Sequence, residues 1–518
     1  MSPSSPGLRA GRREWIGLAV IALPCLLYAM DLTVLNLAVP SLSADLKPGA
    51  AQLLWIVDIY GFMVSGFLVT MGTLGDRIGR RRLLMMGAAA FGAASVAAAF
   101  SNSAGMLIAT RALLGIAGAT LAPSTLSLIR TMFNDPAQRT FAIGVWITSY
   151  SAGGTIGPLL GGVLLQYFWW GSVFLLGVPV MLLLLVLGPV LLPEYRDPKA
   201  GRLDLPSAGL SLASVLAVIY GLKHMAQDGP GWTSAAAVAA GLVLGAWFVR
   251  RQARLASPLI DLRLFRAPAF TASLVTYMMA TFVVFGVFVF TSQYLQLVVG
   301  LSPLEAGLAT APWPLGFVVG SMVTPRLARR FPPATLMAGG LVVAAAGFAL
   351  LAGAGGGAGL PWFIASSVIF SLGLAPVFTL ATDTIVGSAP PERAGAAAAI
   401  SETGSELGGA LGIALLGSLG TALYRGAMAD VMPGGLSPEA ADAARGTLGG
   451  ALATAASLPE PIGPALADAA RGAFAHSLQV NALICAAVVI VLAVVAAVTL
   501  RRPRPGTEPS GSIEALGL

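Results

Sequence analysis

Long apolar stretches dominate this sequence: about fourteen of them, each near 20 residues long, follow one another along most of the 518 residues. A helix needs about 20 apolar residues to cross the hydrocarbon core of a bilayer. Only 10% of the residues are charged, whereas an ordinary soluble domain carries about 25%. With a mean hydropathy of +0.83, a soluble fold could not cover its apolar surface. We therefore expect an all-α integral membrane protein.

The predicted spans set the domain organisation. They are residues 15–40, 52–72, 83–102, 104–130, 140–163, 169–192, 205–226, 233–250, 268–291, 303–325, 334–353, 361–386, 394–424 and 477–500. We expect a cytoplasmic tail over 1–14, a six-helix bundle over 15–192, two linking helices within 193–267, a second six-helix bundle over 268–500 and a disordered tail over 501–518. Residues 425–475 are rich in Ala, Gly and Pro, and we expect an external loop with short helical pieces there.

The distribution of positive charge predicts the orientation. If the N-terminus is cytoplasmic, 24 of the 30 Lys and Arg residues lie in cytoplasmic segments, as the positive-inside rule requires. Five lie outside (Lys47, Lys223, Arg425, Arg445 and Arg471), and Arg111 lies within a span. This bias favours an even number of spans and two cytoplasmic termini. It also accounts for the net charge of +7 better than nucleic-acid binding does.

Four carboxylates within predicted spans are candidates for function. Asp31 lies deep in the first span, and Asp58 enters the second from the outside, so both could line one outward vestibule. Glu402 and Glu406 are four residues apart near mid-membrane, and therefore share a helix face. A carboxylate at such depth costs several kcal/mol unless it is paired, hydrated or protonated. We predict Asp31 and Glu402 as proton sites, with Glu406 and Asp58 as cation or proton partners.

Each of these residues also has a structural interpretation. A buried guanidinium needs an anion or backbone carbonyls, so Arg111 must face the bundle, and Asp31 could be its structural partner alone. Asp58 could be a satisfied interface residue, and the two glutamates could both be structural. We nevertheless group Arg111 with the proton-coupling residues.

The link between the second and third spans carries a specific motif. It reads Gly72-Thr-Leu-Gly-Asp-Arg-Ile-Gly-Arg-Arg-Arg82 and resembles the signature of the major facilitator superfamily between helices 2 and 3. We expect Gly72, Asp76, Arg77, Gly79 and Arg80 to control conformation, with Asp76 capping a helix start or pairing with Arg80 or a neighbouring helix. The alternative is a basic loop that only fixes topology. A degraded echo, Thr324 to Arg330, suggests two repeated halves.

Other stretches resemble narrower groups within that superfamily. Asp31 to Pro40 and the acidic stretch Ala399 to Gly408 resemble the fourteen-helix drug:proton antiporter branch of the EmrB/QacA type, and Leu107 to Gly115 resembles the intramembrane arginine motif of proton-coupled members. Residues 153–162 resemble the antiporter motif of exporters. There Gly153, Gly157 and Gly161 form a smooth stripe for a close neighbour, and Pro158 bends the helix, although ordinary small-residue packing would give the same pattern.

The resemblance covers essentially the whole chain and implies a function. It implies a major facilitator fold of two six-helix bundles plus two linking helices, and proton-coupled, alternating-access export of lipophilic, mainly cationic compounds such as quaternary ammonium ions, dyes and biocides. The expected setting is the bacterial cytoplasmic (inner) membrane, with a monomer that meets protons, membrane lipids and cationic small molecules but no nucleic acid. The proton gradient would be the energy source, without a cofactor or metal.

Two other functions stay open. The chain could export an endogenous metabolite, lipid, siderophore or antibiotic, or it could be a non-transporting membrane receptor or scaffold. An enzyme is disfavoured because the sequence shows no nucleophile–base pair and no metal-ligand spacing, and an ATP-driven pump because it shows no phosphate-binding loop.

Aromatic residues are the candidates for contact with a lipophilic cation, because aromatic faces attract quaternary ammonium groups. Eight lie in spans that could line a central cavity: Tyr28, Trp55, Trp146, Tyr150, Phe285, Tyr294, Trp313 and Phe317. Trp and Tyr also populate the membrane interfaces, so lipid-facing and packing roles are the alternatives.

Overall fold

A computed structural model describes residues 9–48, 50–196, 204–228, 231–255, 258–353, 359–432 and 438–500. Within these ranges the chain is helical and contains no strand. The first half comprises α1 (Arg12–Leu46), α2 (Ala50–Ile78), α3 (Arg80–Ala99), α4 (Ala104–Gly118), α5 (Leu121–Met132), α6 (Pro136–Tyr167), α7 (Ser172–Leu175) and α8 (Gly177–Leu191). The pairs α4–α5 and α7–α8 each continue as one apolar span, so this half has six long helical segments.

Two helices and a short turn connect the halves. They are α9 (Leu205–Asp228), α10 (Trp232–Gln252) and the 3₁₀ turn η1 (Leu262–Arg266). The second half comprises α11 (Pro268–Gln293), η2 (Tyr294–Val298), α12 (Pro303–Thr310), α13 (Pro312–Leu327), α14 (Pro333–Ala352), α15 (Gly359–Ser388), η4 (Pro391–Arg393), α16 (Ala394–Leu411), η5 (Gly412–Leu416), α17 (Gly417–Val431), α18 (Pro438–Gly446), α19 (Leu448–Ala456) and α20 (Ile462–Thr499).

Every predicted span falls on one of these helices or on two or three that follow one another. Thirteen helical segments of the described chain are long and apolar enough to cross a membrane. The predicted span 140–163 is not among them: α6 is long enough, with 32 residues, but its Gly, Ser, Thr and Gln residues make it less apolar. The count of fourteen crossings therefore stays a prediction.

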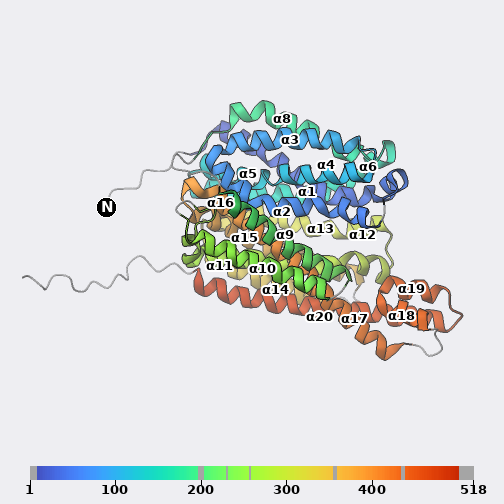
Figure 1. The fold of residues 1–518 in the computed structure, drawn as a ribbon. Helices are drawn as coiled ribbons and strands as arrows, with labels where there is room; N and C mark the ends of the chain where they lie inside the picture. Colours follow the sequence, from blue (N-terminus) through green and yellow to red (C-terminus); the bar gives the residue numbers. More distant parts are fainter. Residues whose placement is uncertain are drawn as a thin grey trace, which may run out of the picture.

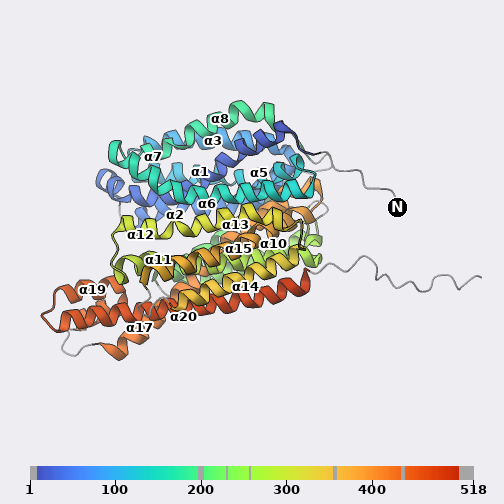
Figure 2. The same cartoon turned by 180° about the vertical axis from the view of Figure 1, so that it is seen from behind.

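Buried apolar side chains form two separate clusters. One gathers residues of α1 to α8, together with Val386, Ala394 and Ala398. The other gathers residues from η1 through α20. Each half thus has its own core, and the two halves meet along a seam where α2 and α5 pack on α16, and α6 packs on α13 and α15. The linking helices α9 and α10 lie over one face of this seam (Figure 1), and α6 and α13 meet on the opposite face (Figure 2).

The two ends of the bundle differ. The helix α1 begins and α20 ends at the same end, which we name the inner end because the charge distribution predicts it to be cytoplasmic (Figure 1). At the outer end, α18, α19 and the adjoining parts of α17 and α20 project beyond the other helices (Figures 1 and 2). The predicted loop 425–475 is thus largely helical where it is described, and α20 begins fifteen residues before the predicted span at 477.

Candidate functional site

Two glutamates of α16 lie at the seam between the halves. The Glu406 carboxylate accepts hydrogen bonds from two residues of the opposite half: from the Tyr28 hydroxyl of α1 at 3.1 Å and from the Ser65 hydroxyl of α2 at 3.2 Å. The Glu402 carboxylate accepts one from the Tyr277 hydroxyl of α11 at 3.4 Å, within its own half. Neither glutamate forms an ion pair with any described residue. Their partners are hydroxyl groups, which carry no compensating charge.

A chain of aromatic rings runs from Glu406 into the first half. The Tyr28 ring lies 5.9 Å from that of Tyr60 and 5.5 Å from that of Tyr150, and Tyr150 lies 4.7 Å from Trp146. The Arg111 guanidinium sits 5.0 Å from the centre of the Tyr60 ring. Of the predicted aromatic residues, Tyr28, Tyr150 and Trp146 are thus brought together beside Glu406.

Asp31 and Arg111 form a buried ion pair inside the first half. The guanidinium donates to the Asp31 carboxylate at 2.9 Å, to the backbone carbonyl of Ile56 at 2.9 Å and to that of Val57 at 3.4 Å. The Arg111 side chain is 1% exposed and that of Asp31 is 14% exposed. Asp31 also lines a cavity of about 20 Å³ between α1, α3, α7 and α8, which is room for about one water molecule. The pairing suggested by the sequence is present, and whether Asp31 also exchanges protons stays a prediction.

Asp58 has a partner that the sequence did not suggest. Lys223 of the linking helix α9 donates to the Asp58 carboxylate of α2. The Lys223 ammonium also lies 4.9 Å from the centre of the Phe62 ring, one turn further along α2. Asp58 is therefore paired in this structure.

The remaining predicted aromatic residues are dispersed. Tyr294 and Trp313 are buried in the core of the second half, at 3% and 7% exposure. Phe317 packs on Phe378, whose ring also contacts Tyr277 beneath Glu402. Trp55 and Phe285 are more than 40% exposed. Contact with a substrate stays a prediction for all five, and among them Phe317 is linked to Glu402 through the rings of Phe378 and Tyr277.

The link between α2 and α3 joins the halves at the inner end. Asp76 accepts from the Arg80 guanidinium at 3.1 Å and from the backbone N–H groups of Gly395 and Ala396, which begin α16, at 3.1 and 3.0 Å. Asp76 therefore both pairs with Arg80 and caps a helix of the other half, as the motif suggested. Gly72 permits this approach, because a Cβ there would lie 2.5 Å from the Gly395 carbonyl oxygen.

The same link depends on a turn that favours glycine. Gly79 separates α2 from α3 with a φ of 111°, a backbone conformation that side chains disfavour. The next residue, Arg80, donates to the backbone carbonyls of Ser127 and Pro391 and to the Thr131 hydroxyl. The turn thus directs Arg80 across the seam, since Pro391 belongs to the second half.

Further polar contacts close the inner end. Asp383 of α15 accepts hydrogen bonds from Arg139 and Thr140 of α6, both at 2.7 Å. Tyr195 donates to Glu392 at 3.0 Å. These contacts hold the inner end of the seam shut in this structure.

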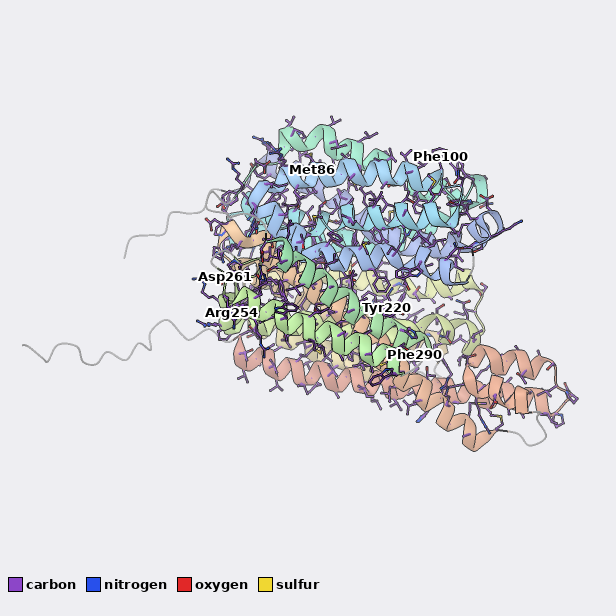
Figure 3. The ribbon with its side chains drawn as sticks, viewed as in Figure 1. Met86, Phe100, Tyr220, Arg254, Asp261 and Phe290 are labelled. Carbon is purple, nitrogen blue, oxygen red and sulfur yellow. The ribbon has the colours of Figure 1, made fainter. Side chains whose placement is uncertain are left out.

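Asp261 ties the segment before α11 to the start of α16. Its carboxylate pairs with Arg393 and Arg263, and Figure 3 labels it beside Arg254 at the inner end. Burial raises the pKa of Asp261, but hydrogen bonds from Arg263 and the charge of Arg393 outweigh this effect. The net pKa of Asp261 lies below its usual value, so the carboxylate is charged near neutral pH.

The glycine stripe of α6 faces α1. A Cβ on Gly153 would lie 2.2 Å from the Leu26 carbonyl oxygen, and one on Gly161 would lie 2.7 Å from Val34. Gly157, between them, is also buried, while the side chain of Pro158 lies outside the described part of the chain. The predicted close neighbour is therefore α1, the helix that carries Asp31.

Sequence reasoning missed four residues of this region: Tyr60, Ser65, Tyr277 and Lys223. Each places a polar group inside an apolar span, and a buried hydroxyl or ammonium group needs a partner. That signal does not reveal which partners Ser65, Tyr277 and Lys223 would find. The Tyr60 hydroxyl has no hydrogen-bond partner among the described residues, and this residue contributes its ring to the contact with Arg111. The described residues contain no cluster of metal-ligating side chains.

Two packed halves of membrane-spanning helices, with carboxylates at their seam, define the class of this protein as a multi-pass membrane transporter. Residues 21–413 match the Major Facilitator Superfamily family model. The chain belongs to the Major Facilitator Superfamily.

Two relatives match this chain over most of its length. The chain is 46% identical over 494 residues to the multidrug efflux pump LfrA of Mycolicibacterium smegmatis, covering 95% of this chain and 98% of that protein. It is 37% identical to the methyl viologen resistance protein SmvA of Salmonella typhimurium, covering 86% and 90%. The crystal structure of the human organic anion transporter MFSD10 (TETRAN) shows the same fold, with a TM-score of 0.58, 16% identity and coverage of 92% and 99%.

Proposed function

We propose that this protein is a proton-coupled multidrug efflux antiporter of the bacterial inner membrane, which exports lipophilic, mainly cationic compounds by alternating access. One observation carries the proposal: Glu402 and Glu406 lie at the seam with only hydroxyl partners among the described residues. The names of the relatives LfrA and SmvA, a multidrug efflux pump and a methyl viologen resistance protein, support it.

The exchange of a proton for an organic cation follows from the negative charge of the carboxylates. A carboxylate taken out of water favours its neutral form, and a second carboxylate nearby increases that preference. A bound organic cation favours the ionised form instead, so proton and cation compete for the same negative charge. Each proton that moves inward through 100 mV contributes about 2.3 kcal/mol. The proton gradient would thus drive export without a cofactor, and we expect a single chain to suffice.

The hydroxyl partners give the exchange a structural consequence. Tyr28 and Ser65 donate to Glu406 from the first half, and both donations need acceptor sites on the carboxylate. Protonation converts one carboxylate oxygen into a donor and makes it a weaker acceptor, so one of these bonds should weaken or reverse. The charge state of Glu406 would therefore alter the attachment between the two halves, which is the movement that alternating access requires.

The test is proton-driven efflux of ethidium from proteoliposomes. We expect Glu402→Gln and Glu406→Gln each to lower the rate at least about tenfold, because a fixed neutral amide cannot exchange protons. Glu460→Gln, which alters an exposed glutamate near the outer end, should leave the rate unchanged. Full efflux by both seam variants would exclude the proposed coupling.

Export of an antibiotic or other endogenous compound is the second candidate. One observation favours it: the chain is 34% identical to the tetracenomycin C resistance and export protein of Streptomyces glaucescens, covering 81% of this chain and 77% of that protein. Counterflow measurements that compare ethidium with a neutral aromatic antibiotic would separate the two candidates, since a site built on carboxylates favours the cation.

A further inference from the structure

The lysine of the linking helix lies in a site with the features of an organic-cation site. Lys223 contributes an ammonium group, Asp58 a carboxylate, and Phe62 an aromatic face 4.9 Å from that ammonium. Trp55 packs against Phe62, with 6.0 Å between ring centres, and is 44% exposed. A negative charge with aromatic faces is the donor set that binds alkylammonium and arylammonium ions.

The site lies near the outer end and is partly exposed on the surface of the bundle. Asp58 is eight residues into α2, near its outer start, and the Asp58 and Lys223 side chains are 20% and 32% exposed. Tyr220, which Figure 3 labels on α9, lies one turn before Lys223 and marks this part of the helix. The charge of Lys223 also interacts with that of Glu406. The outer site is therefore electrostatically connected to Glu406 at the seam.

Lys223 comes from a different helix than the other three residues of this site. Asp58, Phe62 and Trp55 belong to α2 of the first half, whereas α9 belongs to neither half and packs on α2, α16, η5 and α17. An ammonium group tethered to a separate helix can leave the site without any change in the fold of α2. An incoming organic cation would have to displace it.

We propose that Asp58, Phe62 and Trp55 form an outer binding site for lipophilic organic cations, and that Lys223 is a tethered competitor that empties this site towards the outside. The proposal rests on the proposed export function. In the structure, with its inner end closed, Lys223 occupies the site. A cation that reaches Asp58 from the seam meets this competitor and is released, so Lys223 favours export over rebinding.

The competition between Lys223 and an organic cation should change the apparent Kd of the cation by a measurable factor. When a binding-competent site is free only a fraction of the time, the apparent Kd rises by the inverse of that fraction. If Lys223 leaves Asp58 about one tenth of the time, its removal tightens cation binding about tenfold. A neutral ligand of the same shape has no charge to compete with and should bind unchanged.

The experiment measures equilibrium binding of tetraphenylphosphonium to the full chain in nanodiscs. We expect Lys223→Gln and Lys223→Met to bind it about tenfold more tightly, and Lys223→Arg to retain the wild-type affinity because it retains the charge. The gain should vanish in the double variant Lys223→Gln/Asp58→Asn. Binding of triphenylphosphine oxide, a neutral analogue, should not change in any variant. Tyr220→Leu, on the same helix, is the matched control and should bind tetraphenylphosphonium like the wild type.

Two results would overturn the proposal. One is an unchanged affinity for tetraphenylphosphonium in both charge-removing variants, each shown to be folded by its thermal unfolding. The other is a gain that persists when Asp58 is also neutralised. Failure of the proposed function would look different: the wild-type protein would bind the cation but show no efflux driven by a proton gradient.

Discussion

At the scale of single residues, the partner of each carboxylate decides whether that carboxylate can take up a proton. Asp31, Asp58 and Asp76 each face a cation within the described structure. Glu402 and Glu406 instead face hydroxyl groups. A carboxylate held by a guanidinium cannot take up a proton without leaving an unpaired buried cation, whereas one held by hydroxyls can. The two glutamates are therefore the residues best suited to titrate during transport.

The buried pair Asp31–Arg111 predicts an asymmetric response to mutation. Arg111→Ala leaves a buried carboxylate without compensation and should lower the free energy of unfolding by about 3–5 kcal/mol. Asp31→Asn should cost less, because Arg111 keeps the carbonyls of Ile56 and Val57. Thermal unfolding in detergent measures both. Equal losses in the two variants would mean that these carbonyls do not support the guanidinium.

At the scale of elements, close packing of α6 on α1 fixes the helix that carries Asp31. Gly153→Ala should destabilise the protein by about 1–3 kcal/mol, the usual cost of overpacking, because its Cβ would lie 2.2 Å from the Leu26 carbonyl oxygen. Gly154→Ala is the matched control, since a Cβ there meets nothing within 4 Å. Thermal unfolding should separate the two variants, and an equal response would contradict the close approach.

The linking pair α9–α10 carries a pH-dependent contact at its inner end. Hydrogen bonds from Arg251 and Ser207 lower the pKa of Asp204 to about 2. A lowered pKa in the folded protein adds stability that is fully present above the ordinary value of 3.8 and is lost as the pH falls towards 2. Asp204→Asn should therefore unfold at a lower temperature than the wild type at pH 6, with the difference vanishing towards pH 2. A difference independent of pH would exclude this linkage.

At the scale of the whole molecule, polar contacts at the inner end select one arrangement of the halves. Asp383→Asn removes the charge that Arg139 faces across the seam, so the inner end should open more often. In a Ser321→Cys background, maleimide should then react faster at this position, which is fully buried and lies against Gly144 of α6. Thr310→Cys, at the outer end of the same span, serves as the comparison. Unchanged labelling at position 321 would show that Asp383 does not contribute to closure.

The sequence predicted the whole-molecule arrangement better than the details of the site. Apolar length placed thirteen of the fourteen predicted spans on helices that are long and apolar enough to cross a membrane, because a bilayer imposes its thickness on the chain, whereas 140–163 falls on the less apolar α6. The contact of Lys223 with Asp58 could not be predicted, because hydropathy does not say where the linking helices dock. The sequence did predict short helical pieces in residues 425–475, but not that α18 packs on α19 and α19 on α20. Motifs identified Asp76 and Gly153, but the hydroxyl partners of the two glutamates come from three different helices and leave no local pattern.

The contact of Asp76 with the other half has a consequence for how such proteins can diverge. Its partners across the seam are main-chain amides of residues 395 and 396, which every amino acid except proline supplies. The amide of residue 396 needs no particular side chain for this contact, whereas residue 395 is restricted to glycine, because a Cβ there would lie 2.5 Å from the Asp76 carboxylate oxygen. The acidic residue must therefore be kept together with a glycine in the other half, and not with a residue of opposite charge.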